Sequence, residues 1–262
     1  MNLLYFGSSR RQLFGAYHAP AAAERGAVVI CAPWGPEYIA AHHVLHRLAT
    51  RLSESGYHAL RFDYYGTGDS GGTREEGTLD SWCEDAAVAA DELRDISGVS
   101  SVTTIGVRLG AVVAWRLARL RDDVPAVMMW DPVVNGAAYM EELLSAQAEI
   151  DRWSVSPVRP RRPSDEPVDV LGFPLTQQMR SSIETVKLEE FAQPVRAQVY
   201  LYYSSELPEQ VSLQESLTGG GTEFHTETMP GRSPWYDDEP LGAAGIPSTM
   251  LDRMVEQLPR LS

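Results

Sequence analysis

The 262-residue sequence is poor in features that mark several classes of protein. Its only two cysteines, Cys31 and Cys83, lie in unrelated segments, which excludes a disulfide framework and favours a reduced, cytoplasmic protein. There are 22 lysines and arginines against 36 aspartates and glutamates, so we expect neither nucleic acid nor an anionic membrane as a partner. No apolar run approaches membrane-spanning length, and the first residues lack a signal-peptide pattern. We therefore expect no membrane insertion.

The most informative segment is 102–114, which is typical of a strand, a sharp turn and a helix. Gly106 and Gly110 flank the centre of this turn, as glycines flank the nucleophile in a Gly-x-Ser-x-Gly elbow. The central residue is Arg108, whose guanidinium neither deprotonates nor forms an acyl-enzyme. The sequence thus predicts the elbow without its usual chemistry.

Hydrophobic periodicity predicts strands that alternate with amphipathic helices, which is typical of a mostly parallel sheet covered on both faces. Besides the elbow strand, the expected strands are 3–6, 12–17, 27–32, 59–63, 125–130, 198–203 and 223–229. Besides the elbow helix, the expected helices are 40–55, 79–96, 139–150, 177–190 and 248–258, with a short one within 204–221. The alternation breaks down around the Pro/Arg-rich stretch 156–163. We expect a core of residues 1–134 and 194–262, with a helical lid inserted as residues 135–193.

Four motifs support a resemblance to a known family. They are Pro33-Trp34-Gly35 after a strand, the glycine-rich turn 63–70, the elbow 106–110 and Trp130-Asp131-Pro132 at a strand end. With them the sequence resembles the α/β-hydrolase superfamily, in its branch similar to serine aminopeptidases and acyl esterases. It is similar within that branch to the proteins called exosortase-A-system-associated hydrolase type 2, which share the Gly-x-Arg-x-Gly elbow. The resemblance covers residues 25–145 and implies an α/β-hydrolase fold, but a fold does not determine a function.

The superfamily places a catalytic acid after a late strand and a histidine after the last strand. In the acid position this sequence has Glu206. The segment 229–237, which follows the last expected strand, contains no histidine, and His225 falls inside that strand. We therefore expect a degraded Ser-His-Asp triad.

Arg108 has two competing interpretations. An arginine at the N-terminus of the elbow helix makes a receptor for a carboxylate, a phosphate or an enolate oxygen. Alternatively, Glu37, Asp131 or Glu206 binds the guanidinium internally, and the arginine fills the former nucleophile position.

Other candidate residues surround the elbow. Glu37 is a potential general base if burial raises its pKa, and Asp131 is either a base or the group that orients Arg108. Backbone N–H groups of Trp34 and Gly35 occupy the oxyanion-loop position. The candidate catalytic residues are Arg108, Asp131, Glu37 and Glu206, and the candidate substrate-binding residues are Trp34, Gly35, Val107, Leu109 and His42.

His42 and His46 share a helix face at a spacing used by metal ligands, but a third ligand is not evident, so no metal site is expected. No other cofactor is expected either. The oligomeric state is open, and a homodimer is compatible with the fold.

Three functions remain open at this point. The first, which we favour, is a small-molecule enzyme of the lyase, isomerase or cyclase type, in which Arg108 binds an anionic or oxyanionic group. The second is an inactive relative that binds an acyl-type ligand or a partner protein. The third is a hydrolase in which Asp131 or Glu206 activates a water molecule. All three functions imply an anionic or acyl-bearing small molecule as the ligand, and the inactive relative has a partner protein as the alternative.

Overall fold

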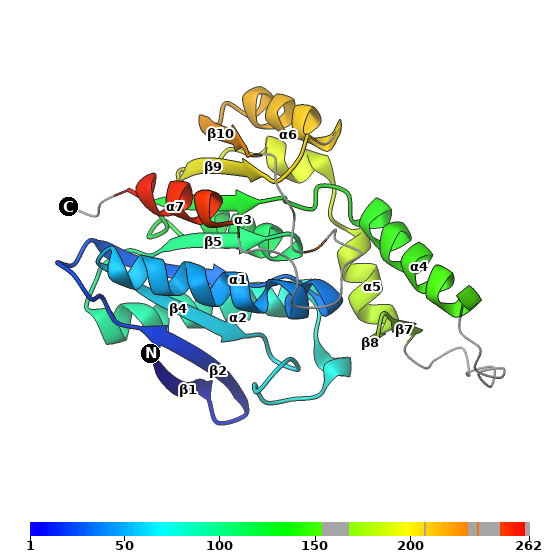
Figure 1. Cartoon of the computed structure of the whole chain (residues 1–262), viewed down its shortest axis with the longest axis horizontal. Coiled ribbons are helices and arrows are strands. Elements are labelled where there is room, and N and C mark those ends of the chain that lie inside the picture. Colours follow the sequence, from blue (N-terminus) through cyan, green and yellow to red (C-terminus); the bar gives the residue numbers. More distant parts are fainter. Residues whose placement is uncertain (154–167, 207, 230–234, 236–246, 260–262) are drawn as a thin grey trace.

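The structure is a computed structural model that describes residues 1–153, 168–206, 208–229, 235 and 247–259. Its centre is an eight-stranded sheet in the order β1-β2-β4-β3-β5-β6-β9-β10 (Figure 1). The strands are β1 (Asn2–Ser8), β2 (Arg11–His18), β3 (Gly26–Cys31), β4 (Tyr57–Asp63), β5 (Thr103–Val107), β6 (Ala126–Trp130), β9 (Gln198–Tyr203) and β10 (Phe224–Thr228). Pairing is antiparallel from β1 through β2 to β4, and parallel from β4 to β10. The mostly parallel sheet expected from the sequence is confirmed.

Helices cover both faces of the sheet (Figure 1). Helix α1 (Gly35–Glu54) packs beside α7 (Ser248–Glu256) on one face, and α2 (Leu79–Ser97) packs beside α3 (Leu109–Leu120) on the other. Helix α6 (Pro208–Gly219) packs against the short 3-10 helix η2 (Leu188–Ala192). Strands β3, β5 and β6 are fully buried between these layers, as expected for the central strands of a parallel sheet. No helix in the described part of the chain has the length and apolar character needed to cross a membrane.

Helices α4 (Gly136–Trp153) and α5 (Gln177–Glu184) and strands β7 (Val168–Val170) and β8 (Phe173–Leu175) lie at the carboxyl ends of the parallel strands, at the right of Figure 1. Within this segment, 136–192, β7 and β8 form a hairpin, and η2 follows α5. Helices α4 and α5 pack so closely that a Cβ on Gly136 would lie 1.8 Å from the carbonyl oxygen of Ile183. The Pro/Arg-rich stretch 156–163 lies outside the described residues. That this segment is a separate lid domain stays a prediction.

Three local features differ from the sequence-based expectations. Helix α1 begins at Gly35 rather than near residue 40, because Pro36 fits the first turn, where its missing N–H is not needed. The helix expected over 177–190 ends at Glu184, and the chain resumes as η2 after a turn in which Val186 accepts a backbone hydrogen bond from Gly136. The hairpin of β7 and β8 was not expected, because strands of three residues carry too little periodicity to detect.

Candidate functional site

Arg108 stands at the sharp turn between β5 and α3, with φ 52° and ψ −121°. This backbone conformation is strained for a residue other than glycine. The turn needs its two glycines, because a Cβ on Gly106 would lie 2.3 Å from the carbonyl oxygen of Gly110, and one on Gly110 would lie 2.3 Å from that of Cys31. The elbow predicted from the sequence is therefore present, and the side chain at its centre is only 4% exposed.

The guanidinium of Arg108 is bound by groups from three elements. Its Nε donates to Oε1 of Glu37, on α1, at 2.7 Å. Its Nη1 donates to the backbone carbonyl of Asp131 at 3.4 Å, and its Nη2 lies 3.8 Å from Oε2 of Glu142, on α4. The guanidinium also lies over the ring of Tyr139, whose hydroxyl donates to Oε2 of Glu37 at 2.8 Å. Of the two interpretations of Arg108, the geometry shows the internal ion pair.

Burial controls the protonation of this cluster. It raises the pKa of Glu37, and the adjacent charge and hydrogen bonds of Arg108 oppose that rise. Burial also raises the pKa of Tyr139 well above the ordinary value, as does the neighbouring Glu37 carboxylate. The phenol therefore stays protonated and donates a hydrogen bond to Glu37. A buried ion pair of this kind is stable when both charges are present and hydrogen-bonded. The cluster therefore joins the first turns of α1 and α4 to the elbow.

Asp131 is buried at the end of β6, with φ 43°. Its Oδ1 accepts the backbone N–H of Ser204 at 2.9 Å, and its Oδ2 accepts the indole N–H of Trp235 at 3.0 Å. Burial raises the pKa of this carboxyl, and these hydrogen bonds oppose the rise. Arg108 donates to the backbone carbonyl of Asp131, and its charge also lowers the pKa of the Asp131 carboxyl.

Trp235 occupies the segment after β10, where the superfamily pattern places its histidine. Its indole donates a hydrogen bond to Asp131, as an imidazole would to a catalytic acid, and its ring lies edge-on to Trp130 at 5.0 Å. An indole N–H is a donor only and cannot accept a proton. The absence of a histidine from this segment is evident in the sequence, and the indole N–H of Trp235 is the signal there that indicates a partner for Asp131. Tyr139 and Glu142 have no such signal, because nothing in the sequence places α4 against the elbow.

The remaining candidates make no hydrogen bond with the ion pair that the structure records. Glu206, after β9, is exposed, and Ser204 instead contacts Asp131. Val107 and Leu109 are fully buried. His42 is exposed on α1 and lines a separate cavity near β4.

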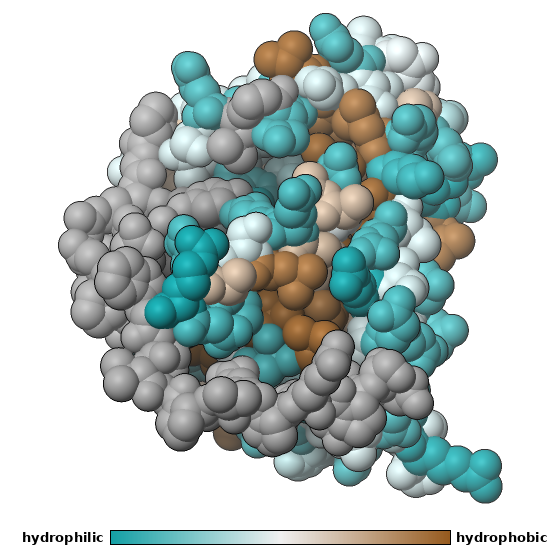
Figure 2. All heavy atoms as spheres, turned by 90° about the vertical axis from the view of Figure 1, so that its right-hand side faces the viewer, coloured by the Kyte–Doolittle hydropathy of each residue, from teal (hydrophilic) through white to brown (hydrophobic). Residues whose placement is uncertain are grey.

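A cavity of about 160 Å³ lies at the start of α1, and Trp34 and Gly35 are among its lining residues. Its walls are mainly aromatic, formed by Trp34, Tyr38, Tyr64, Trp82 and Phe173. The exposed Arg74, in the 3-10 helix η1 (Arg74–Glu76), lines it as well, whereas Arg108 does not. Viewed onto the carboxyl ends of the strands, apolar side chains gather in a hollow surrounded by hydrophilic ones (Figure 2).

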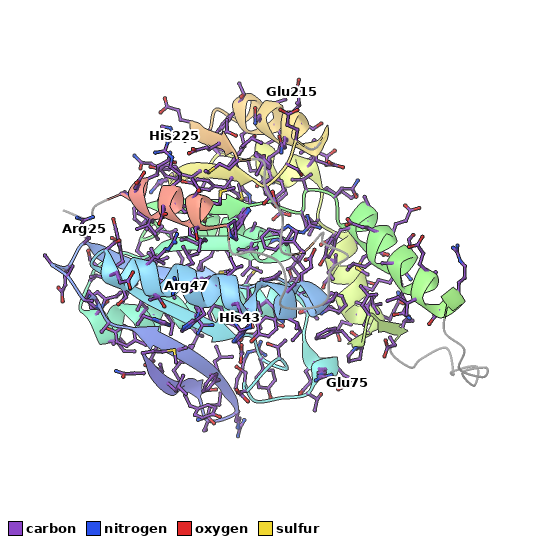
Figure 3. The ribbon with its side chains drawn as sticks, in the orientation of Figure 1. Arg25, His43, Arg47, Glu75, Glu215 and His225 are labelled. Atoms are coloured by element: carbon purple, nitrogen blue, oxygen red, sulfur yellow. The ribbon has the colours of Figure 1, made fainter. Side chains whose placement is uncertain are left out.

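The described residues contain no group of three histidine, cysteine or carboxylate side chains that could hold a metal ion. Nδ1 of His46 faces the guanidinium of Arg61, and the ring of His42 contacts His43. His225 is exposed on β10, stacked on Tyr200 and far from the elbow (Figure 3).

Comparison with known proteins identifies the family. The profile of the serine aminopeptidase S33 family matches residues 24–189. The chain belongs to this hydrolase family. No curated protein matches the sequence significantly.

Solved structures show the same fold at low sequence identity. Est1E from Butyrivibrio proteoclasticus, with ferulic acid bound, has a TM-score of 0.65 at 19% identity over 97% of this chain and 98% of its own. DcsB in complex with its substrate analogue has a TM-score of 0.65 at 14% identity, over 97% of each chain. A putative hydrolase from Agrobacterium vitis has a TM-score of 0.59 at 20% identity, over 97% of this chain and 95% of its own. The α/β-hydrolase fold expected from the sequence is confirmed.

Proposed function

We propose that this family member binds a small acyl- or aryl-bearing ligand noncovalently in the aromatic cavity and forms no acyl-enzyme at the elbow. The observation that carries the proposal is the ion pair of Arg108 with Glu37, which fills the position of the nucleophile with a buried and hydrogen-bonded group. The arginine elbow also supports membership of the subgroup that resembles exosortase-A-system-associated hydrolase type 2.

The chemistry of the cavity supports this ligand class. Five aromatic side chains offer ring faces and edges to an apolar body, and aromatic contacts contribute beyond the area that they bury. The first turn of α1 begins at the cavity, and the side chain of its N-cap residue, Trp34, makes no capping hydrogen bond. Backbone N–H groups there are suited to a carbonyl or carboxylate oxygen, and Arg74 offers a cation on the exposed side. Est1E, which has this fold, is described with an aromatic acid bound, ferulic acid.

The two other functions considered from the sequence require rearrangements. A hydrolase that activates water through Asp131 needs this carboxylate to release the N–H groups of Ser204 or Trp235. Activation through Glu206 needs an exposed side chain to reach the elbow. An anion receptor at Arg108 needs the guanidinium to exchange Glu37 for the ligand.

A noncovalent enzyme of the lyase, isomerase or cyclase type is the second candidate, because Glu37 is a buried carboxyl of raised pKa adjacent to the cavity residues Gly35 and Tyr38. Such an enzyme would use Glu37 to move a proton and Arg108 to hold an oxyanion. Mass spectrometry of ligands incubated with the protein separates the two candidates. Conversion that is lost in Glu37→Gln supports the enzyme, and recovery of unchanged ligand supports binding alone.

The binding proposal is tested with ferulic acid as the probe, titrated by calorimetry. Replacing Trp34 by alanine removes one aromatic wall, so we expect the dissociation constant to rise about tenfold, equivalent to about 1.4 kcal/mol. Tyr5→Ala is the matched control, because Tyr5 is an exposed aromatic residue on β1, outside the cavity. Thermal unfolding of both variants checks that they are folded.

A serine-directed fluorophosphonate probe addresses the covalent alternative. We expect no labelling of the wild-type protein, because the elbow residue is an arginine. Robust labelling, or steady turnover of p-nitrophenyl esters, would contradict the proposal. Equal affinity of the Trp34→Ala variant and the wild type for ferulic acid would place the ligand elsewhere.

A further inference from the structure

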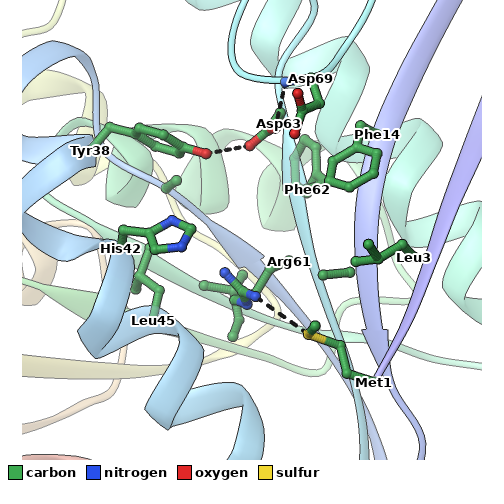
Figure 4. Close-up of a pocket in the computed structure, with 13 residues that line it drawn as sticks. Met1, Leu3, Phe14, Tyr38, His42, Leu45, Arg61, Phe62, Asp63 and Asp69 are labelled. Atoms are coloured by element: carbon green, nitrogen blue, oxygen red, sulfur yellow. Dashed lines mark hydrogen bonds between the residues drawn. The ribbon is translucent and has the colours of Figure 1, made fainter.

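A second cavity, of about 260 Å³, lies on the α1 face of the sheet, between α1, β4 and the hairpin of β1 and β2 (Figure 4). Its floor is largely apolar, with Leu3, Phe14, Leu45 and Phe62 among the lining residues. Tyr38 lines both this cavity and the aromatic one. Nothing in the proposed function uses the second cavity.

Arg61 lines the cavity and is half-buried there. Its Nε is completely buried and has no hydrogen-bond partner among the described residues. The contacts of its Nη2 are with Nδ1 of His46 at 3.4 Å and with Sδ of Met1 at 3.9 Å, and neither is an anion. A buried donor without an acceptor is unfavourable, so the described residues leave this guanidinium incompletely satisfied.

Other arginines of similar or greater burial are ion-paired. Arg108 has Glu37, Arg116 has Glu190, and Arg121 has Asp123. For Arg61, no carboxylate of the described residues lies within 4.0 Å. Among the arginines that the structure describes, one that is partly withdrawn from water without an ion-paired carboxylate is an exception, and Arg61 lines a cavity.

The nearest lining carboxylate, Asp63, is engaged elsewhere. Its Oδ1 accepts the hydroxyl of Tyr38 at 2.5 Å, and its Oδ2 accepts the backbone N–H of Asp69 at 3.0 Å. Figure 4 shows Asp63 directed to Tyr38 and the glycine-rich turn, with Arg61 directed toward His42 and the opposite end of the cavity. Asp63 therefore acts on Arg61 through its charge and makes its hydrogen bonds with other groups.

The imidazoles near Arg61 add hydrogen-bonding groups rather than charge. Burial and the Arg61 charge lower the pKa of His18 to about 4. Burial first, and then Arg61, lower the pKa of His42 and of His46 as well. At neutral pH, Arg61 thus provides a positive charge on the described lining of this cavity, to which Met1 also contributes.

We propose that this second cavity binds a small monocarboxylate, with its carboxylate on the guanidinium of Arg61 and its short apolar body against Leu45, Phe14 and Phe62. The fork of N–H donors in arginine matches a carboxylate, and such charge-assisted hydrogen bonds are strong and directional. A single negative charge is favoured over a phosphate dianion, because Asp63 and Asp69 line the other end and repel excess charge. The modest volume limits the apolar body to about the size of a benzene ring or a hexyl chain.

The test compares benzoate and hexanoate with their neutral amides, benzamide and hexanamide. We titrate each into 15N-labelled protein and follow the arginine Nε–H signal that is missing in Arg61→Gln. We expect both carboxylates to shift this signal and to bind at least tenfold more tightly than the matched amides. Arg61→Gln should lose that preference, whereas Arg61→Lys, which keeps the charge but not the fork, should retain part of it.

Two controls isolate the site. Arg25→Gln removes an exposed arginine outside the cavity and should leave carboxylate binding unchanged. Trp34→Ala alters the aromatic cavity and should leave the Arg61 signal and its shift with added carboxylate unchanged. The experiment therefore separates failure of the proposed function from failure of this inference. No response to either carboxylate, equal binding of acid and amide, or unaltered binding by folded Arg61→Gln and Arg61→Lys would overturn the inference. Loss of the Arg61 response in Trp34→Ala would overturn the assignment to a separate cavity.

Discussion

Arg108 and Glu37 are only 4% and 6% exposed, and the guanidinium supplies the counter-charge of the buried Glu37 carboxylate. Neither has bulk water to solvate it, and their distance of 2.7 Å is that of a short charge-assisted hydrogen bond. Tyr139 completes the pair from α4. The individual residues are therefore energetically coupled, and changing one of them alters the protonation of the next.

Replacing Arg108 by methionine removes the cation and leaves Glu37 buried without it. We expect the free energy of unfolding to fall by about 3–5 kcal/mol at neutral pH, the usual range for breaking a buried pair. The double variant Arg108→Met with Glu37→Gln should recover a large part of this loss. Urea denaturation of the three proteins measures these differences, and equal stability of the single and double variants would contradict the coupling.

The loss in Arg108→Met should also depend on pH. Without the guanidinium, Glu37 loses the charge and hydrogen bond that most oppose the effect of burial, so its folded pKa rises further above the unfolded value of about 4.3. A carboxyl with a raised folded pKa favours the folded state while it is protonated, and this contribution is lost as pH rises. The single variant should therefore be closer in stability to the double variant at pH 5 than at pH 8.

The close packing of the elbow between β5 and α3 against the end of β3 depends on contacts between backbone atoms. Gly110 lies against the carbonyl oxygens of Cys31 and Ala32, at 2.3 and 2.4 Å from where a Cβ would stand. These atoms belong to the end of the central strand β3 and the residue after it, so they have little freedom to move. Close approach, rather than conformational freedom, is the reason for this glycine.

Gly110→Ala is expected to destabilise the protein by more than about 3 kcal/mol, because overpacking against backbone cannot be relieved by a rotamer change. Gly219→Ala is the matched control. Gly219 ends α6, and an added Cβ there would meet nothing within 4 Å, so we expect a neutral or slightly stabilising effect. Thermal unfolding of the two variants compares them directly, and similar melting temperatures would contradict the packing argument.

The sequence was sufficient to predict elements with strong local signals. The central strands were visible as apolar runs, and the spacing of Gly106 and Gly110 indicated the elbow. The contacts of Arg108 with Tyr139 and of Asp131 with Trp235 were not predictable, because they join segments that only the tertiary fold brings together. Glu37 was named as one of three possible partners for Arg108, and the start of α1 at Gly35 is what places it in the first turn beside the elbow. Local periodicity cannot supply this information.

Over the whole molecule, charge is organised differently at the two ends of the sheet. The ion pair and the aromatic cavity lie at the carboxyl ends of the parallel strands. At the amino ends, Asp123 lies in the loop before β6, and its backbone carbonyl accepts the N–H of Val102, next to β5. The Asp123 carboxylate accepts hydrogen bonds from Arg121 and Arg94, which lower its pKa to about 2.

Asp123→Asn should reveal this network through its dependence on pH. A carboxyl with a lowered folded pKa stabilises the folded state above its unfolded pKa of about 4, and the contribution disappears as pH falls toward 2. We expect the variant to be less stable than the wild type at pH 6, with a difference that shrinks between pH 4 and 2. The measurement is urea unfolding across this range.

Asp122→Asn is the control for that series. Asp122 pairs with Arg196, and both side chains are more than 80% exposed, so the pair contributes little to stability. Two results would rule out the network as the cause. One is a stability difference between Asp123→Asn and the wild type that is the same at every pH. The other is an equally large stability difference for Asp122→Asn.

Trp235, after β10, limits how a serine at position 108 could function. A serine at position 108 would leave the buried Glu37 carboxylate without its cation. The indole of Trp235 could not accept the proton of the serine hydroxyl. Reversion thus demands coordinated changes on α1, at the elbow and beyond β10, three places far apart along the chain. We expect single changes among these three to be destabilising, because each leaves a buried group without its partner.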